Sequence, residues 1–200
     1  MLEQALTGMA ASRPGFKVPI EAEGMEVVSQ LHDRGEPIIL CTGHFALTRA
    51  AFCLLEPGRR PVLIADYNDE MYERNWTLME PLQVLRSGVD VLARALSLLK
   101  SGHLLISFVD YRIDYSPDGL TCISPNIFRL AEKAGATVFF FVPQLERDGT
   151  IKVRFHQPEP SRFSCAAEAN RCAAQFAEFA TRHRGWKCVV RRPKSAPSVR

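Results

Sequence analysis

The first apolar run of the chain lies within residues 36–49, Glu-Pro-Ile-Ile-Leu-Cys-Thr-Gly-His-Phe-Ala-Leu-Thr-Arg. It sets the pattern of strand, turn and helix by which the remaining elements are predicted. Their Ile- and Leu-rich part, 37–42, has the length and composition of a short buried strand. Small residues then form a turn, and the spacing of apolar residues over 45–55 predicts a helix that ends at Pro57-Gly58. His44 is therefore expected at the corner between a strand and a helix.

The same alternation of two hydrophobic periods continues along the chain. Further strands are predicted over 61–67, 82–85, 103–109, 137–142, 151–155 and 186–190, and helices over 24–34, 68–79, 89–100, 126–134 and 164–183. Continuous apolar strands separated by helices predict an α/β fold, a single domain whose mixed, largely parallel sheet is covered by helices on both faces. Gly149 predicts a hairpin-like turn and hence an antiparallel strand near one edge of the sheet.

Size and composition fit one soluble domain with a substantial core. The chain has 200 residues, 46% of them hydrophobic and 24% charged. The net charge of +3 is too small to predict a nucleic-acid partner, but it is compatible with an anionic substrate or membrane surface. We find neither a secretory signal nor a membrane-spanning run, so a cytoplasmic location is expected. Residues 193–200 are interpreted as a basic flexible tail, and a peripheral contact with the inner membrane stays open.

The chain has six cysteines, and no two of them have the C-x-x-C spacing of a redox or zinc site. Most lie in apolar segments, so all six are interpreted as buried, reduced thiols. Cys41 is three residues before His44, which leaves a Cys/His nucleophile as an alternative to a core role. The histidines show no metal-ligand spacing, and no metal site is predicted.

Two polar segments follow predicted strands, at the edge of the sheet where α/β proteins place their sites. His44 follows the first, and an imidazole there is suited to accept a proton near neutral pH. Asp110 and Arg112 follow the strand 103–109 and would converge on His44 if the two strands are neighbours. The alternatives are a surface or capping histidine, a loop or helix-capping carboxylate at Asp110 and a solvated charge at Arg112.

Five segments, taken in order, resemble the bacterial lipid A biosynthesis acyltransferases of the lauroyl and myristoyl type, which belong to the wider lysophospholipid acyltransferase group. They are EAEGMEVV (21–28), IILCTGHF (38–45), LRSGVDVLARALSLLKSG (85–102), LLISFVDYR (104–112) and SPNIFRLAEKAGATVFFFVPQLERDG (124–149), and HRGWKCVVRR (183–192) is a weaker match. The resemblance implies one acyltransferase-like domain over 1–192.

The resemblance also implies a reaction. His44 would be the general base that removes a proton from a hydroxyl or amine, and that acceptor would attack the thioester of acyl carrier protein or coenzyme A. The acceptor would be a small molecule or a lipid, and no cofactor is implied beyond the thioester donor. Arg86 and Arg129 match polar positions of the family and are expected to contact phosphate of the donor; surface salt bridges are the alternative.

The main departure from the family is Arg49, which stands where the family has a carboxylate five residues after the histidine. A guanidinium cannot accept the imidazole N–H. Three explanations stay open: another carboxylate such as Asp110 orients His44, His44 acts alone on a more nucleophilic acceptor, or the protein binds acyl groups without transferring them. In the active alternatives, Arg49 or backbone N–H groups near Gly43 would stabilise the oxyanion. Thioester hydrolysis is a third reading of the function.

Overall fold

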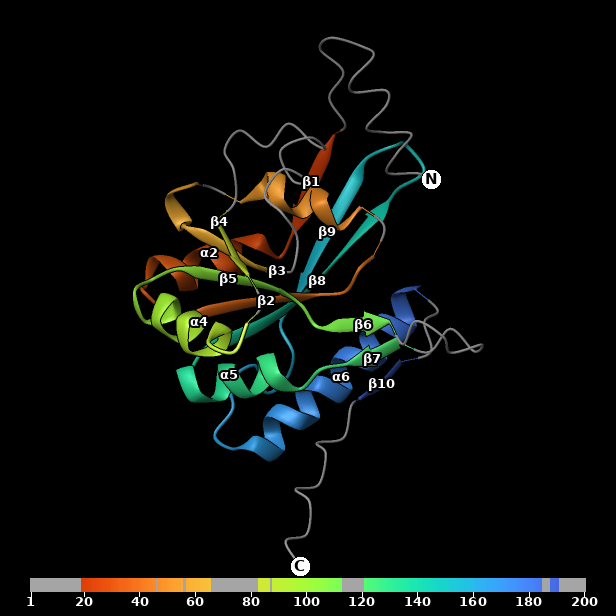
Figure 1. The fold of residues 1–200 in the computed structure, drawn as a ribbon. Coiled ribbons are helices and arrows are strands. Elements are labelled where there is room, and N and C mark those ends of the chain that lie inside the picture. The colour runs from red at the N-terminus through yellow and green to blue at the C-terminus, as the bar shows by residue number, and fades with distance from the viewer. Residues whose placement is uncertain are drawn as a thin grey trace, which may run out of the picture.

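A seven-stranded sheet forms the centre of the computed structural model, which describes residues 19–45, 47–55, 57–65, 83–86, 88–112, 121–184 and 188–190. Its strands are β1 (Ile20–Glu23), β2 (Ile38–Thr42), β3 (Pro61–Ala65), β4 (Gln83–Arg86), β5 (Leu104–Phe108), β8 (Thr137–Leu145) and β9 (Ile151–His156). They lie in the order β1-β9-β8-β2-β5-β3-β4 (Figure 1). Every neighbouring pair is parallel except β8 and β9. The predicted α/β class and the antiparallel strand after Gly149 are confirmed.

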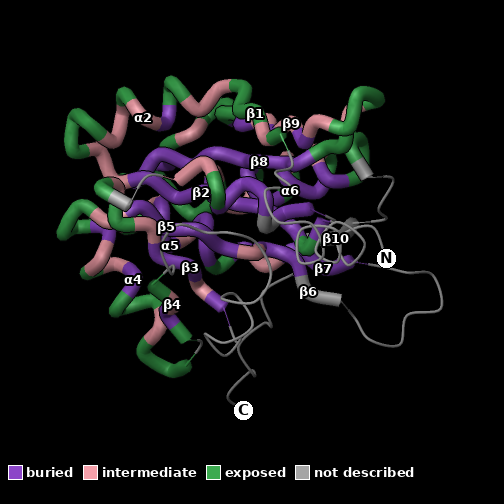
Figure 2. The backbone as a smooth tube through the Cα atoms, turned by 90° about the horizontal axis from the view of Figure 1, so that it is seen from above, coloured by how far each residue is buried: buried purple, intermediate pink, exposed green. Residues whose placement is uncertain are grey.

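Helices cover both faces of this sheet. The elements are α2 (Met25–Asp33), α4 (Val91–Lys100), α5 (Asn126–Ala134), α6 (Ala166–Arg184) and the 3-10 helices η1 (Thr48–Leu54) and η2 (Pro57–Arg59). In Figure 1, α4, α5 and α6 lie below the sheet and α2 lies above it. Because both faces are covered, β2 is buried along its whole length and its neighbours β5 and β8 along most of theirs, as the purple tube in Figure 2 shows.

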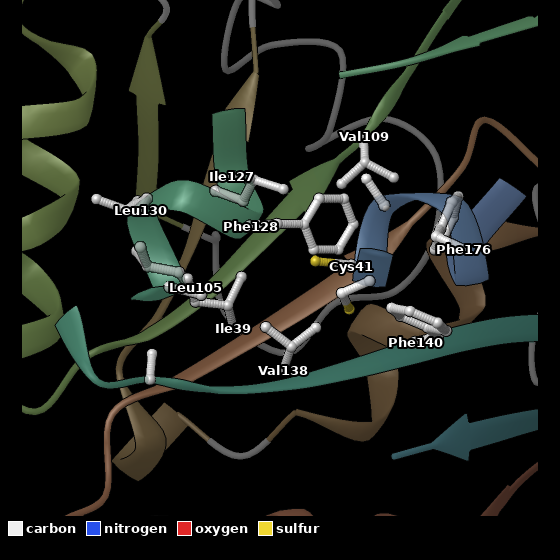
Figure 3. Close-up of a cluster of buried hydrophobic side chains, with 14 of the residues drawn as sticks. Ile39, Cys41, Leu105, Val109, Ile127, Phe128, Leu130, Val138, Phe140 and Phe176 are labelled. Atoms are coloured by element: carbon white, nitrogen blue, oxygen red, sulfur yellow. The ribbon is translucent and has the colours of Figure 1, made fainter. Parts of the chain in front are cut away.

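Alternation along β2 divides the core in two. Ile39 and Cys41 point toward α4, α5 and α6, where Phe128 and Phe140 fill the space between sheet and helices (Figure 3). Ile38 and Leu40 point to the opposite face, where they pack with residues of α2 and η1. Successive strand residues thus stabilise both layers, which is why the strand sequences are continuously apolar rather than alternating.

A second, three-stranded sheet follows directly from β5. It comprises β6 (Asp110–Arg112), β7 (Thr121–Ile123) and β10 (Cys188–Val190) in the order β10-β7-β6. Residues 188–190 of the strand predicted over 186–190 form β10, which does not join the main sheet because it pairs in parallel with β7 instead. Strands of three residues carry too few apolar positions for their partner to be predicted from sequence.

The helix predicted over 45–55 is a 3-10 helix, η1, that begins only at Thr48. Apolar spacing cannot separate the two windings, since repeats of 3.0 and 3.6 residues both bring positions i and i+3 to one side. Leu47 precedes η1 with φ 68, in the left-handed region, so the segment starts from a tight turn.

Other element predictions differ at their ends or lie outside the described residues. Helix α5 has the bounds expected from sequence, and the strand predicted over 82–85 is β4, one residue further on. Strand β1 was not predicted, because its sequence Ile-Glu-Ala-Glu has little apolar character. The helix over 68–79 and the tail over 193–200 fall outside the described residues.

The interpretation of all six cysteines as buried is wrong for two of them. Cys41, Cys122 and Cys172 are buried, but Cys53 and Cys165 are exposed, and all five are free thiols. Cys53 lies in η1 and turns outward although its neighbour Phe52 is buried. The side chain of Cys188 lies outside the described residues.

Candidate active site

Two parallel neighbours in the middle of the sheet bring His44 and Asp110 together. Strands β2 and β5 pair in register, with Thr42 opposite Phe108. His44 stands two residues after Thr42, and Asp110 stands two residues after Phe108. The two side chains therefore lie at the same carboxyl edge of the sheet, which is the condition that the sequence left open.

Asp110 holds His44 by two hydrogen bonds to a single oxygen. The backbone N–H of His44 donates to Oδ1 of Asp110 at 3.0 Å, and Nδ1 of the imidazole lies 3.0 Å from the same oxygen. An ionised carboxylate only accepts, so an ionised Asp110 requires the imidazole to carry its proton on Nδ1. The neutral ring then has its lone pair on Nε2, the atom available to accept a proton from a bound molecule.

The two partners differ sharply in exposure. The side chain of His44 is 42% exposed, whereas that of Asp110 is 1% exposed. Burying a carboxylate is costly unless hydrogen bonds compensate for lost water, and both N–H groups of His44 supply such bonds. A buried acid behind a half-exposed histidine is the arrangement that orients an imidazole for work at the surface.

Backbone hydrogen bonds lock the chain around Asp110. The N–H of Val109 donates to the carbonyl of Thr42 at 2.9 Å, and the N–H of Ser124 donates to the carbonyl of Val109 at 2.8 Å. These bonds tie β5 to β2 on one side and to the end of β7 on the other. Asp110 is thus placed by two sheets at once rather than by a free loop.

Two buried threonines fix the turn that carries His44. The hydroxyl of Thr42 donates to the carbonyl of Phe141 at 3.0 Å, which anchors the end of β2 to β8. The hydroxyl of Thr48 lies 2.9 Å from the carbonyl of Phe45 and 3.1 Å from that of Gly43. These contacts join the start of η1 to the turn at residues 43–45 and so fix its conformation. The role of Thr48 in this turn was not predicted from the sequence.

An aromatic ring covers one face of the imidazole. The ring centroids of Phe108 and His44 are 4.4 Å apart with an angle of 19° between the planes. Sequence reasoning missed this residue as well. The signal that reveals it is the spacing: Phe108 and Asp110 are two residues apart at the end of one strand and so project to the same side.

Of the four arginines expected near the site, two have described side chains. Arg86 is exposed at the end of β4, the third strand from β2, so about 14 Å of sheet separates the two strands. Arg129 lies half-buried on α5, with Nη2 3.4 Å from Oδ1 of Asn170 on α6. Its Nε is buried and has no hydrogen-bond partner in the described part of the chain. Neither guanidinium is hydrogen-bonded to His44.

The other two arginines are placed by their backbone alone. Arg49 belongs to η1 and Arg112 is the last residue of β6, opposite Thr121. Their side chains lie outside what the structure describes. The expected convergence is therefore observed for His44 and Asp110, while the contribution of Arg112 and the oxyanion role of Arg49 stay predictions.

Cys41 does not belong to the same site. Its side chain is fully buried in the core beneath α5 and α6 (Figure 3). Burial, together with the neighbouring Cys172 thiol, raises its pKa well above the ordinary value. A thiol held protonated in an apolar core is a poor nucleophile, which favours the core role over the Cys/His alternative.

The remaining histidines make local contacts. His32 lies 3.2 Å from the carbonyl of Gly102, and His103 lies 2.9 Å from the hydroxyl of Ser101.

Within the described ranges, no three His, Cys, Asp or Glu side chains gather in a way that would hold a metal ion. No helix among the described residues is both long and apolar enough to cross a bilayer.

Neither a comparison with protein-family models nor one with curated proteins finds a match for this chain.

Proposed function

We propose that this protein is an acyltransferase that moves an acyl group from a thioester donor, acyl carrier protein or coenzyme A, to a hydroxyl or amine. The observation that supports it best is the 3.0 Å contact between Nδ1 of half-exposed His44 and Oδ1 of buried Asp110. This pair has the composition of an acid–base dyad, with a carboxylate that orients the imidazole and stabilises its protonated form.

The acceptor oxygen or nitrogen attacks the thioester carbonyl with its lone pair, and Nε2 of His44 takes the O–H or N–H proton as the new bond forms. The carbonyl thereby becomes a tetrahedral oxyanion. When the oxyanion collapses, the C–S bond breaks and the thiolate leaves with the bonding pair. The imidazolium returns its proton to that sulfur. Asp110 stays ionised throughout and balances the positive charge on His44 while it exists.

Asp110 also supplies the hydrogen-bond acceptor for His44 that Arg49 cannot provide. The family that the sequence resembles has a carboxylate at that position, and an arginine cannot take its place as the acceptor of Nδ1–H. In this chain the carboxylate of Asp110, the first residue of β6 and two residues beyond the end of β5, makes that hydrogen bond. Of the explanations left open by the sequence, this geometry favours the one in which another acid orients the histidine.

The positive charge of two arginines supports the binding of a phosphate-containing thioester donor. Arg86 is exposed at the carboxyl edge of β4, and the separation of about 14 Å between β4 and β2 suits a donor whose phosphate is remote from its thioester. Arg129 is the second candidate for a phosphate contact. We propose that the reaction takes place in the cytoplasm, on a small-molecule acceptor or on a lipid at the inner face of the membrane.

A non-catalytic protein that holds an acyl chain or an acyl carrier protein is the alternative. The observation that favours it is Arg49 at the family's acidic position. The two functions differ in one requirement, because binding alone does not need the lone pair on Nε2.

The proposal is tested by incubating acylated carrier protein and acyl-coenzyme A with the protein and a panel of amines and alcohols, followed by mass spectrometry. His44→Gln is the matched variant, since it keeps a polar side chain but no titratable nitrogen. Loss of donor that requires His44 and forms an acylated acceptor supports transfer, and release of free acid supports hydrolysis. Donor binding without consumption by either protein would refute the enzyme and support the alternative.

A further inference from the structure

We propose that Phe108 is a positioning residue for His44: its ring fixes the plane of the imidazole that Asp110 holds at one edge. This inference rests on the proposed function, because the reaction would use the orientation that Phe108 imposes. It assigns a role in the dyad to a residue that carries no polar atom in its side chain.

The contact is close and nearly parallel. The centroids of the two rings are 4.4 Å apart and their planes differ by 19°, which is a stacked pair. Phe108 ends β5, and Asp110 follows it after one residue. The short segment 108–110, from the end of β5 to the start of β6, thus places Phe108 beneath the face of the imidazole and Asp110 at its Nδ1 edge.

A hydrogen bond to Nδ1 holds one atom of a ring that is attached to the chain at Cβ, and small changes in χ1 and χ2 still let the ring rock about the line from Cβ to Nδ1. Such rotation would sweep Nε2, the reacting atom, across an arc on a side chain that is 42% exposed. Stacking against a second ring opposes it. Because proton transfer requires donor and acceptor to be aligned, loss of this restraint lowers the share of molecules in which Nε2 is correctly directed.

Phe108 can act as a restraint because it is itself held. Its side chain is partly buried and packs against the core cluster between the sheet and α2, on the same face of β5 as Leu104 and Ile106. The opposite face of β5, with Leu105 and Val109, belongs to the other cluster. The ring under His44 is therefore an extension of the core rather than a loose surface side chain.

The experiment compares Phe108→Leu, Phe108→Tyr and Phe155→Leu with the wild type. Leucine keeps the apolar contact with the core but removes the stacked ring, and tyrosine restores the ring. Phe155→Leu is the matched control, because Phe155 packs in the same cluster, with its ring 5.6 Å from that of Phe141, and among the described residues it makes no ring stacking with His44 like that of Phe108. An aromatic pair contributes about 0.5–1.5 kcal/mol, so kcat of Phe108→Leu should fall about 2- to 12-fold.

Two readouts separate positioning from loss of stability. The KM for the donor should not change in Phe108→Leu, and Phe108→Tyr should recover kcat, whereas Phe155→Leu should lower the melting temperature and keep kcat. By NMR, the Cε1–H group of His44 should be rigid and shifted by the ring current of Phe108. In Phe108→Leu that shift should vanish and the order parameter should drop.

An unchanged order parameter and kcat in Phe108→Leu would overturn the inference, as would an equal fall of kcat in Phe155→Leu. A wild-type protein that consumes no donor at all would instead refute the proposed function, and the catalytic role of Phe108 with it. The NMR measurement needs no substrate, so it reports separately whether Phe108 immobilises the ring.

Discussion

Replacing Asp110 with asparagine removes one negative charge from beside His44 and leaves the shape of the side chain almost unchanged. Oδ1 accepts both the backbone N–H and the Nδ1–H of His44, each at 3.0 Å. The backbone N–H requires an acceptor at this position, so the amide oxygen of asparagine should occupy the place of Oδ1. The imidazole then keeps its tautomer and its orientation, and what is lost is the charge that stabilises the imidazolium.

The size of the effect follows from that charge. A hydrogen bond to a charged group contributes about 1.5–3 kcal/mol and a neutral one about 0.5–1.5 kcal/mol, so loss of the charge weakens the retained Nδ1–H bond by about 1–1.5 kcal/mol. A tenfold change in rate corresponds to about 1.4 kcal/mol, and we therefore expect kcat of Asp110→Asn to fall about 5- to 12-fold. Because the Asp110 side chain is 1% exposed and does not meet the donor, the KM for the thioester should stay the same.

The assay is consumption of the thioester donor under saturating acceptor, measured for the wild type, Asp110→Asn and His44→Gln. Asp148→Asn is the control for the chemical change, since Asp148 is a loop carboxylate that accepts the N–H of Thr150. It should turn over like the wild type. The reasoning fails if Asp110→Asn keeps the wild-type kcat while His44→Gln is inactive, because His44 would then act without its acid.

Three further predictions concern stability and thiol reactivity. The N–H and hydroxyl of Ser164 bond to Glu168 and hold the pKa of that carboxyl below its usual value. A carboxyl whose pKa is lower in the folded than in the unfolded protein stabilises the fold at a pH above its pKa in the unfolded protein. That stabilisation is lost as the pH falls through its pKa in the folded protein. Glu168→Gln should therefore lower the melting temperature at neutral pH, with the difference from wild type shrinking in acid; an unchanged difference would contradict this assignment. Burial raises the pKa of the Cys172 thiol to about 12, so a maleimide should modify exposed Cys165 in the native protein and leave Cys172 untouched, as peptide mass spectrometry can check. Phe128 is fully buried, and Phe128→Ala should lower the free energy of unfolding, measured by urea titration, by about 3–5 kcal/mol. A decrease of less than about 1 kcal/mol would contradict the placement of Phe128 in the core.

The layers of the fold could be predicted because the central strands are long and apolar. The run 137–142 and the helix over 126–134 differ strongly from their polar flanks, and the structure places β8 and α5 there. The small sheet could not be predicted, since β6 and β7 have three residues each and one of them begins with a charged aspartate. Too few alternating positions remain for a period to be measured.

The site was only half predictable for a topological reason. His44 and Asp110 each follow a strand, and the sequence shows this, but their contact depends on β2 and β5 being neighbours in the sheet. Residues 61–65 form β3, which comes between them in sequence yet lies on the far side of β5. Strand order of this kind is set by crossovers, which local patterns do not encode.

Phe108 was missed because an aromatic residue inside an apolar run predicts core and nothing more. The spacing of Phe108 and Asp110 puts both on one side of the chain, and the pairing of Thr42 with Phe108 then directs that side toward the imidazole. Thr48 was missed likewise, since its hydroxyl serves the turn through contacts with Gly43 and Phe45 that no spacing rule describes.

Asp110 is expected to hold the proton of His44 on Nδ1 and to leave the lone pair on Nε2. Nitrogen-15 NMR of the histidine ring reports this tautomer without any knowledge of donor or acceptor. Neutral His44 should be protonated at Nδ1 in the wild type, and this preference should be lost in Asp110→Ala. A ring protonated at Nε2 in the wild type, or one whose tautomer does not respond to removal of Asp110, would contradict it.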